Sequence, residues 1–313
     1  MIHSTLIDAD TLAAHLHDSR WVLLDCRFEL TDAAAGEKAY AAGHIEGARY
    51  AHLDRDLAAP PTSTSGRHPL PDPADFALRA GAWGIDAATQ VVVYDQGNSF
   101  YAARAWWIFR WLGHERVAVL DGGLAAWTRS GRSLSEAAPR IQPRGFIARP
   151  DPRRVTAIDE VLAQVGNPSI RLVDARSVER YAGGSESIDP ISGHVPGAVS
   201  HHYGRNLDAR GLMHPAETLR DEWTRTLNGV PAEQMIAMCG SGVSACVNLL
   251  AMEHAGIRGA RLYPGSWSEW IRDPARPVAR ARSPPGGGRA LGRGRARHPP
   301  PHLGRGAGGS RPL

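Results

Sequence analysis

The chain has 313 residues, of which 42% are hydrophobic and 22% are charged, and its formal net charge is +4. That length exceeds the range in which one hydrophobic core usually keeps growing, so we expect two domains. No apolar run approaches the ~20 residues that cross a bilayer, and the N-terminus lacks a secretory signal, which argues against membrane-spanning and exported classes. The three cysteines are too few for a disulfide framework and favour a cytoplasmic location.

The positive charge is concentrated in the C-terminal tail, residues 280–313. This segment holds eight arginines, and no acidic residue follows Asp273, so residues 1–279 carry a net charge of −4. Its Gly, Pro and Arg content without apolar periodicity predicts disorder. The tail could be a nucleic-acid-binding arm or an incidental extension. Because no aromatic residue is interleaved for base stacking, we favour the second interpretation and predict no nucleic-acid or membrane partner.

In the first half, short β-branched runs alternate with amphipathic stretches. Strands are expected at residues 21–25, 48–51, 91–94 and 117–120. Helices are expected at residues 10–17, 72–82, 102–112 and 124–130. Such alternation is typical of an α/β fold in which helices cover both faces of a parallel sheet. A Pro- and Arg-rich segment, residues 138–152, is predicted to be a linker.

The second half repeats the first. Four segments recur in the same order, 143 to 150 residues later: 21–27 and 170–176, 43–48 and 193–198, 91–95 and 235–239, and 120–127 and 263–270. Four matches in register indicate a duplicated domain. We therefore expect tandem domains at residues 5–137 and 153–279, joined by the 138–152 linker.

The most informative segment is residues 235–250. An apolar strand-like run ends at Cys239, a Gly/Ser loop follows, and a helical stretch begins after it. Sites in parallel sheets form at the carboxyl ends of the strands. Loop amides and a helix N-terminus stabilise negative charge, so we expect Cys239 to act as a thiolate. Gly240 and Gly242 would allow the tight turn.

These motifs resemble the rhodanese family of sulfurtransferases in its tandem-domain form, over about residues 5–279. The resemblance rests on four motifs: residues 239–245, 193–198, 121–123 and 265–267. In that family the first domain is a degenerate copy, and here Asp95 stands where that copy would need its cysteine. The loop Cys-Gly-Ser-Gly-Val-Ser is most similar to that of the 3-mercaptopyruvate sulfurtransferase branch, with Ser244 in place of a threonine.

The resemblance implies a covalent mechanism without a metal or cofactor. Cys239 would take sulfur from 3-mercaptopyruvate as a persulfide, release pyruvate, and pass the sulfur to cyanide, a small thiol or a thioredoxin-like protein. Arg180 would contact the donor carboxylate. The implied binding loop comprises Gly240, Ser241, Gly242, Val243 and Ser244, and the implied proton relay comprises Ser241, His68 and Asp54.

The charge of the loop favours the same donor. Residues 240–245 are uncharged, which suits a monoanion held elsewhere better than the thiosulfate dianion. A second arginine that some relatives use is missing from residues 185–191, which weakens the expectation of tight mercaptopyruvate binding.

Two other functions are alternatives to sulfur transfer from 3-mercaptopyruvate. Thiosulfate:cyanide sulfur transfer is the first alternative, and a non-catalytic sulfur carrier or interaction module is the second. The sequence argues strongly against a cysteine-based phosphatase, because residues 240–246 contain no basic residue to bind phosphate.

Several further residues are predicted to be structural. We expect Cys26 and Cys246 to be core thiols, Trp267 and Trp270 to be core side chains, and Asp25 and Asp174 to pair with the arginines two residues later. His201 and His202 lack the spaced ligands of a metal site.

Overall fold

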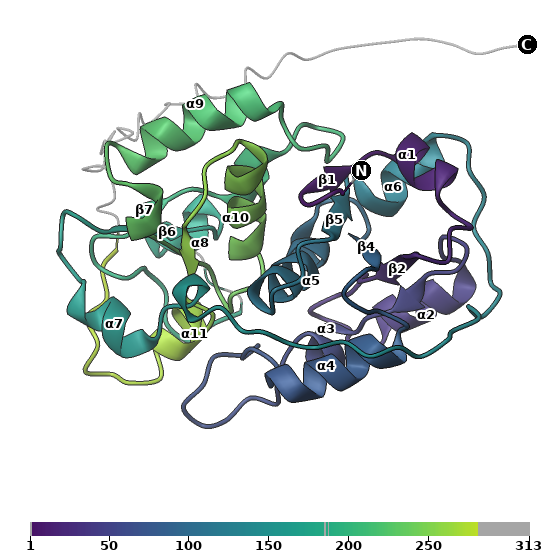
Figure 1. The fold of residues 1–313 in the computed structure, drawn as a ribbon. Coiled ribbons are helices and arrows are strands. Elements are labelled where there is room, and N and C mark those ends of the chain that lie inside the picture. Colours follow the sequence, from purple (N-terminus) through teal and green to yellow (C-terminus); the bar gives the residue numbers. More distant parts are fainter. Residues whose placement is uncertain (1, 185, 187, 281–313) are drawn as a thin grey trace, which may run out of the picture. The chain divides into compact units, whose positions relative to one another are not determined.

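Two parallel sheets, one in each half of the chain, form the framework of the protein (Figure 1). The computed structural model describes residues 2–184, 186 and 188–280, so all but the first residue of the predicted tail lies outside the described residues. The first sheet has the order β1-β5-β4-β2-β3, and the second has the order β7-β6-β8-β9. The strands are β1 (Leu6–Ile7), β2 (Trp21–Asp25), β3 (Arg49–Tyr50), β4 (Gln90–Tyr94), β5 (Val117–Leu120), β6 (Arg171–Asp174), β7 (Val199–Ser200), β8 (Met235–Met238) and β9 (Arg261–Leu262).

Helices and short 3-10 turns connect the strands. The α-helices are α1 (Ala9–Ala14), α2 (Ala35–Ala42), α3 (Leu53–Asp56), α4 (Pro73–Ala82), α5 (Phe100–Trp111), α6 (Gly123–Arg129), α7 (Ile158–Ala163), α8 (Val178–Ala182), α9 (Ala216–Leu227), α10 (Ala245–His254) and α11 (Ser266–Trp270). The 3-10 helices are η1 (Pro152–Arg154), η2 (Tyr203–Asn206) and η3 (Ala232–Gln234). This is the predicted α/β architecture. None of the described helices has the length and hydropathy needed to cross a membrane.

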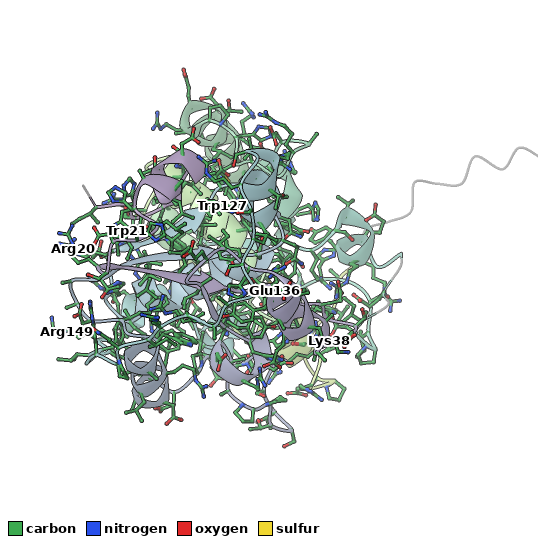
Figure 2. The ribbon with its side chains drawn as sticks, turned by 90° about the vertical axis from the view of Figure 1, so that its right-hand side faces the viewer. Arg20, Trp21, Lys38, Trp127, Glu136 and Arg149 are labelled. Atoms are coloured by element: carbon green, nitrogen blue, oxygen red, sulfur yellow. The ribbon has the colours of Figure 1, made fainter. Side chains whose placement is uncertain are left out.

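Both faces of the first sheet are buried, which explains its uninterrupted apolar strands. In β4, Val91 and Val93 pack into the larger core with α5, whereas Val92 packs on the opposite face in a separate cluster with Leu12 and Trp127. Figure 2 looks onto this half of the chain: Trp127 belongs to the core, whereas Arg20, Lys38 and Arg149 are exposed.

The duplication is visible in matched polar contacts. Arg27 bonds Asp25 at 2.7 Å and the carbonyl oxygen of Gly43 at 2.7 Å. Arg176 bonds Asp174 at 2.6 Å and the carbonyl oxygen of Gly193 at 2.7 Å. The two predicted ion pairs are therefore confirmed. Each arginine fastens the loop after the first long strand of its half.

The two halves meet through α5 and α10. Both helices contribute to one hydrophobic cluster that contains residues of both sheets. Helix α5 is apolar nearly all round and almost wholly buried, as expected of a helix between two sheets. Because α10 begins just after the β8 loop, this packing brings residues of the first half to the carboxyl end of β8.

The elements predicted in the first half lie within a few residues of their observed positions, and β3 is shorter than the predicted strand at residues 48–51. The strands β2 and β5 have the predicted bounds. Helices α2 and α3 were not predicted; α3 has only four residues, too few for a 3.6-residue hydrophobic period to show.

Candidate functional site

Cys239 follows β8 directly and lies at the carboxyl edge of the second sheet. Only 2% of the residue is exposed. Its amide donates to Oγ of Ser266 at 3.0 Å, and its carbonyl oxygen accepts from the amide of Trp267 at 3.0 Å. The loop is thus held at its beginning by the start of α11, and it leads into α10 at its end.

The loop after Cys239 presents its backbone amides. Among the described residues, the amides of 240–244 find no backbone carbonyl acceptor. Gly242 has φ of +73°, and a Cβ there would lie 2.4 Å from the carbonyl oxygen of Pro264. Only glycine satisfies both restrictions. The predicted role of Gly242 in the turn therefore has a structural reason, while Val243 and Ser244 are buried where the loop enters α10.

The equivalent loop of the first half shows what such a turn binds. Asp95, 144 residues before Cys239, is fully buried. Its Oδ1 accepts from the amides of Gly97 and Ser99 at 3.0 and 3.2 Å, and its Oδ2 accepts from Tyr101 and Ala102 at 2.9 and 3.1 Å. Burial raises the pKa of Asp95, and these amide bonds oppose that rise. A carboxylate thus occupies the anion-binding loop of the first half.

The three residues of the predicted relay come together. Nδ1 of His68 lies 2.7 Å from Oγ of Ser241, and Nε2 lies 3.3 Å from Oδ1 of Asp54. Ser241 belongs to the cysteine loop, whereas the other two come from the first half. Asp54 lies in the first turn of α3 and is not its cap, since His52 takes that position.

His68 is held neutral. Burial lowers its pKa to about 3, and the positive charges of Arg104 and Arg67 contribute. In a neutral imidazole with its proton on Nε2, the nitrogen that faces Asp54 at 3.3 Å, Nδ1 is free to accept the Ser241 hydroxyl proton. The pair is therefore arranged as a base and a hydroxyl at neutral pH.

Arg104 fixes both loops from inside the first half. The side chain is fully buried on α5. Its guanidinium donates to the carbonyl oxygens of Gly242 at 2.9 Å and His68 at 3.0 Å, and also to those of Leu57 and Pro69. Burial lowers the pKa of Arg104. One guanidinium thus ties the histidine segment to the cysteine loop.

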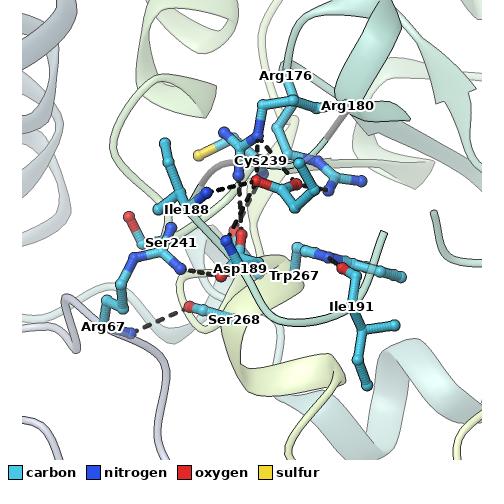
Figure 3. A network of polar contacts seen from close by, with 12 residues as sticks. Arg67, Arg176, Arg180, Ile188, Asp189, Ile191, Cys239, Ser241, Trp267 and Ser268 are labelled. Atoms are coloured by element: carbon cyan, nitrogen blue, oxygen red, sulfur yellow. Dashed lines mark hydrogen bonds and ion pairs between the residues drawn. The ribbon is translucent and has the colours of Figure 1, made fainter. Parts of the chain in front are cut away.

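Arg180 reaches the site, but two carboxylates hold it. Its Nε donates to Glu186 at 2.8 Å, and its Nη2 donates to Asp189 at 2.8 Å. Arg67 of the first half pairs with the other oxygen of Asp189 (Figure 3). A Cβ on Gly240 would lie 2.9 Å from Nη2 of Arg67 and 3.5 Å from Nη2 of Arg180. Both guanidiniums therefore lie over the loop.

This arrangement corrects the inference drawn from the uncharged loop. Residues 240–245 carry no charge, yet Arg67 and Arg180 bring two positive charges beside Gly240 from other segments. An uncharged loop therefore does not mean that charged side chains are absent beside it: both guanidiniums reach Gly240 while paired with carboxylates of other segments. Gly240 has no positive φ, so its backbone conformation does not demand glycine; a Cβ there would meet the ends of these two guanidinium side chains.

Sequence reasoning missed Arg67, Arg104 and Asp189. A signal existed for two of them. Arg67 directly precedes His68, and Arg104 interrupts an otherwise apolar helix, where a buried charge needs several partners. For Asp189 no local pattern marked the contact, since its partners are 9 and 122 residues away.

The residues expected to be structural are buried. Cys26 and Cys246 are fully buried; burial raises the pKa of Cys26, and it raises that of Cys246 to about 12. Trp267 and Trp270 are also fully buried. His201 stacks on Trp223 at 4.1 Å between ring centroids.

Comparisons with known proteins agree with this geometry. The sequence profile of the rhodanese-like domain matches residues 8–130 and 157–273. The chain is 46% identical over 281 residues to a probable 3-mercaptopyruvate sulfurtransferase of Pseudomonas aeruginosa, covering 89% of this chain and 99% of that one. It is 36% identical over 261 residues to a putative thiosulfate sulfurtransferase of Mycobacterium tuberculosis, covering 82% and 90%. The solved structure of 3-mercaptopyruvate sulfurtransferase from Leishmania major is similar with a TM-score of 0.77 and 28% identity, covering 87% of this chain and 76% of that one.

Proposed function

Since this chain belongs to the rhodanese family and has two rhodanese-like domains, we propose that it transfers sulfur from 3-mercaptopyruvate through a persulfide on Cys239. The observation that carries this proposal is the contact between His68 and Ser241. A hydroxyl held by a neutral imidazole beside the cysteine loop suits a reaction that must move a proton as well as a sulfur atom.

In the first step the Cys239 thiolate attacks the donor sulfur. The new S–S bond forms as the bond between sulfur and the methylene carbon breaks, and the electron pair leaves as the enolate of pyruvate. The amides of Gly240, Ser241, Gly242, Val243 and Ser244 lie where negative charge on sulfur develops. The carboxylate of Asp95 in the equivalent loop supports this assignment.

The proton balance involves Ser241 and His68. The donor thiol loses its proton as the persulfide ionises, and the enolate needs one to become pyruvate. The low pKa of His68 makes it a transient proton holder, so that Ser241 and His68 pass the proton on to the enolate. Asp54 keeps the imidazole in the required tautomer.

The donor carboxylate is assigned to Arg180 together with Arg67. Guanidinium groups bind carboxylates in a directional, often bidentate way. Arg67 supplies the second positive charge that the segment 185–191 lacks. Because Arg67 precedes His68, one segment of the first domain serves both recognition and proton transfer.

Thiosulfate:cyanide sulfur transfer is the second candidate. The two guanidiniums beside Gly240 favour a dianion as well as a carboxylate. The proton relay should distinguish the two donors. Thiosulfate releases sulfite and forms no enolate that needs a proton, so only mercaptopyruvate turnover should depend on the relay. In either case the partners are small sulfur donors and acceptors. We propose cyanide, small thiols or a thioredoxin-like protein as acceptors, and the cytoplasm as the location.

Steady-state turnover with both donors tests the proposal. Mercaptopyruvate should be the better donor with cyanide as acceptor, and Cys239→Ser should abolish turnover with both. Mass spectrometry after donor treatment should find one additional sulfur atom on Cys239. A clear preference for thiosulfate would exclude mercaptopyruvate as the main donor. A sulfur adduct that still forms in Cys239→Ser would exclude the persulfide on Cys239.

A further inference from the structure

The Asp189 carboxylate lies between the two guanidiniums assigned to the donor. Its Oδ2 accepts from Nη2 of Arg180 at 2.8 Å, and its Oδ1 pairs with Nη1 of Arg67. Figure 3 shows the carboxylate between these side chains, with Ser241 and Cys239 alongside. One carboxylate therefore bridges an arginine from each domain at the reactive loop.

This carboxylate is enclosed by its partners. The Asp189 side chain is 2% exposed, although the two arginines are 28% and 19% exposed. Its amide donates to Oε1 of Glu186 at 3.2 Å. Glu186 separately neutralises the Nε side of Arg180 and lies 3.6 Å from Arg176. On Arg180, Asp189 binds Nη2, which also faces Gly240, whereas on Arg67 it pairs with Nη1 and leaves Nη2 facing Gly240.

We propose that Asp189 is an internal competitor for the donor site: its carboxylate takes the place that the carboxylate of the donor must occupy. The inference rests on the proposed function, because it assumes that the donor binds Arg67 and Arg180. When a donor with its own carboxylate binds, the arginines exchange their charge-assisted pair with Asp189 for one with the donor. A neutral sulfur compound has nothing to exchange, so Asp189 also selects for anionic donors.

Competition of this kind weakens apparent affinity by the fraction of molecules whose site is filled. If Asp189 holds the guanidiniums in nine-tenths of molecules, its removal lowers the dissociation constant about tenfold. Glu186 provides a matched comparison. It has the same charge, belongs to the same segment and pairs with Arg180, but it does not bridge to Arg67.

The experiment measures binding in a chain that cannot react. Cys239→Ser serves as the parent, and 3-mercaptopyruvate is titrated calorimetrically into the parent and into variants that add Asp189→Asn or Glu186→Gln. The Asn variant should bind about tenfold more tightly, whereas the Gln variant should stay within about twofold of the parent. Asp189→Glu, which keeps the charge, should not tighten binding.

The outcomes separate this inference from the proposed function. If the parent binds mercaptopyruvate and Asp189→Asn leaves the affinity unchanged or weaker, Asp189 is a structural residue and the inference fails alone. If Glu186→Gln tightened mercaptopyruvate binding as much as Asp189→Asn, the loss of one negative charge would explain both results. That outcome would also overturn the inference. If neither the parent nor the Asn variant binds, both proposals fail. Thermal unfolding confirms that the variants are folded, and Asp189→Ser replaces the Asn variant if that one is not.

Discussion

At the residue scale, His68 owes its function to where it is buried. The imidazole is 6% exposed and lies close enough to two arginines to be kept neutral. A histidine on the surface would be partly protonated at neutral pH and would compete for the proton that Ser241 must share. In the proposed mechanism, His68 accepts the proton and the neighbouring guanidiniums hold the negative charge of the donor.

Replacing His68 by Ala should therefore affect one donor only. With mercaptopyruvate the turnover number should fall about a hundredfold, the usual scale for loss of a proton-transfer group. Turnover with thiosulfate, which releases no enolate, should stay within about threefold. Parallel steady-state assays measure both. Equal losses with the two donors would mean that His68 only supports the loop.

Gly240 allows a second residue-scale prediction. In Gly240→Ala the new Cβ would meet Nη2 of Arg67 at 2.9 Å and displace a flexible side chain. We expect the KM for mercaptopyruvate to rise about tenfold, equivalent to one charge-assisted hydrogen bond, with little change in melting temperature. Gly145→Ala is the control, since nothing lies within 4 Å of that position. An unchanged KM would remove Arg67 from donor recognition.

The sequence identified the chemistry of the site better than its electrostatics. Cys239 and Ser241 were found because they lie in the loop motif, and His68 and Asp54 because the family resemblance implies them. The surroundings of Arg180 were not, since Asp189 contacts Arg67 across 122 residues of sequence and across the two domains. A local pattern reports the side chains that a loop contains. It cannot report which charges arrive from elsewhere.

At the scale of elements, α5 connects the fold to the site. Its apolar surface packs on the first sheet and on α10, and Arg104 emerges from it to bind carbonyl oxygens of both active-site segments. Long strands and helices such as β2, β5 and α5 were predictable from their hydrophobic patterns. Of the short elements, α3 was not predicted and β3 is shorter than the predicted strand, because the ends of short elements depend on caps and on strand pairing.

Arg104→Met should lower both stability and activity. Several buried carbonyl groups lose their donor, so the free energy of unfolding should fall by about 3 kcal/mol in urea titrations. Turnover of the remaining folded protein should fall as well, because the His68 and Gly242 segments lose a shared anchor.

Arg110→Met is the matched control on the same helix. Arg110 is also buried, but it pairs with Glu115 and Glu253, away from the cysteine loop. The substitution should lower the free energy of unfolding by about 1–2 kcal/mol and leave turnover unchanged. Equal effects of the two substitutions on turnover would contradict the anchoring role of Arg104.

At the scale of the whole molecule, folding requires that buried histidines stay neutral. Burial lowers the pKa of His68 to about 3 and that of His201 to about 4. In the unfolded chain both protonate near pH 6.5. Below that pH the unfolded state binds more protons than the native state, so stability is fully present at pH 7 and is lost as the pH falls toward 4.

Acid titration of stability tests this account. Between pH 7 and pH 4 each of the two histidines should remove roughly 3 kcal/mol of unfolding free energy. His68→Gln should show a shallower decline than the wild type over the same range. Urea unfolding at several pH values measures the slopes, and identical slopes would show that His68 does not contribute to acid lability.

The carboxylate of Asp95 has a consequence for the duplicated architecture. Its loop is filled by its own side chain, so the two copies of the loop differ in what they can bind. The loop of the second half keeps a thiol, and the first half brings His68 and Arg67 to that loop. Reagents that titrate reactive thiolates should accordingly count one equivalent per polypeptide, even though the chain contains two loops of the same design.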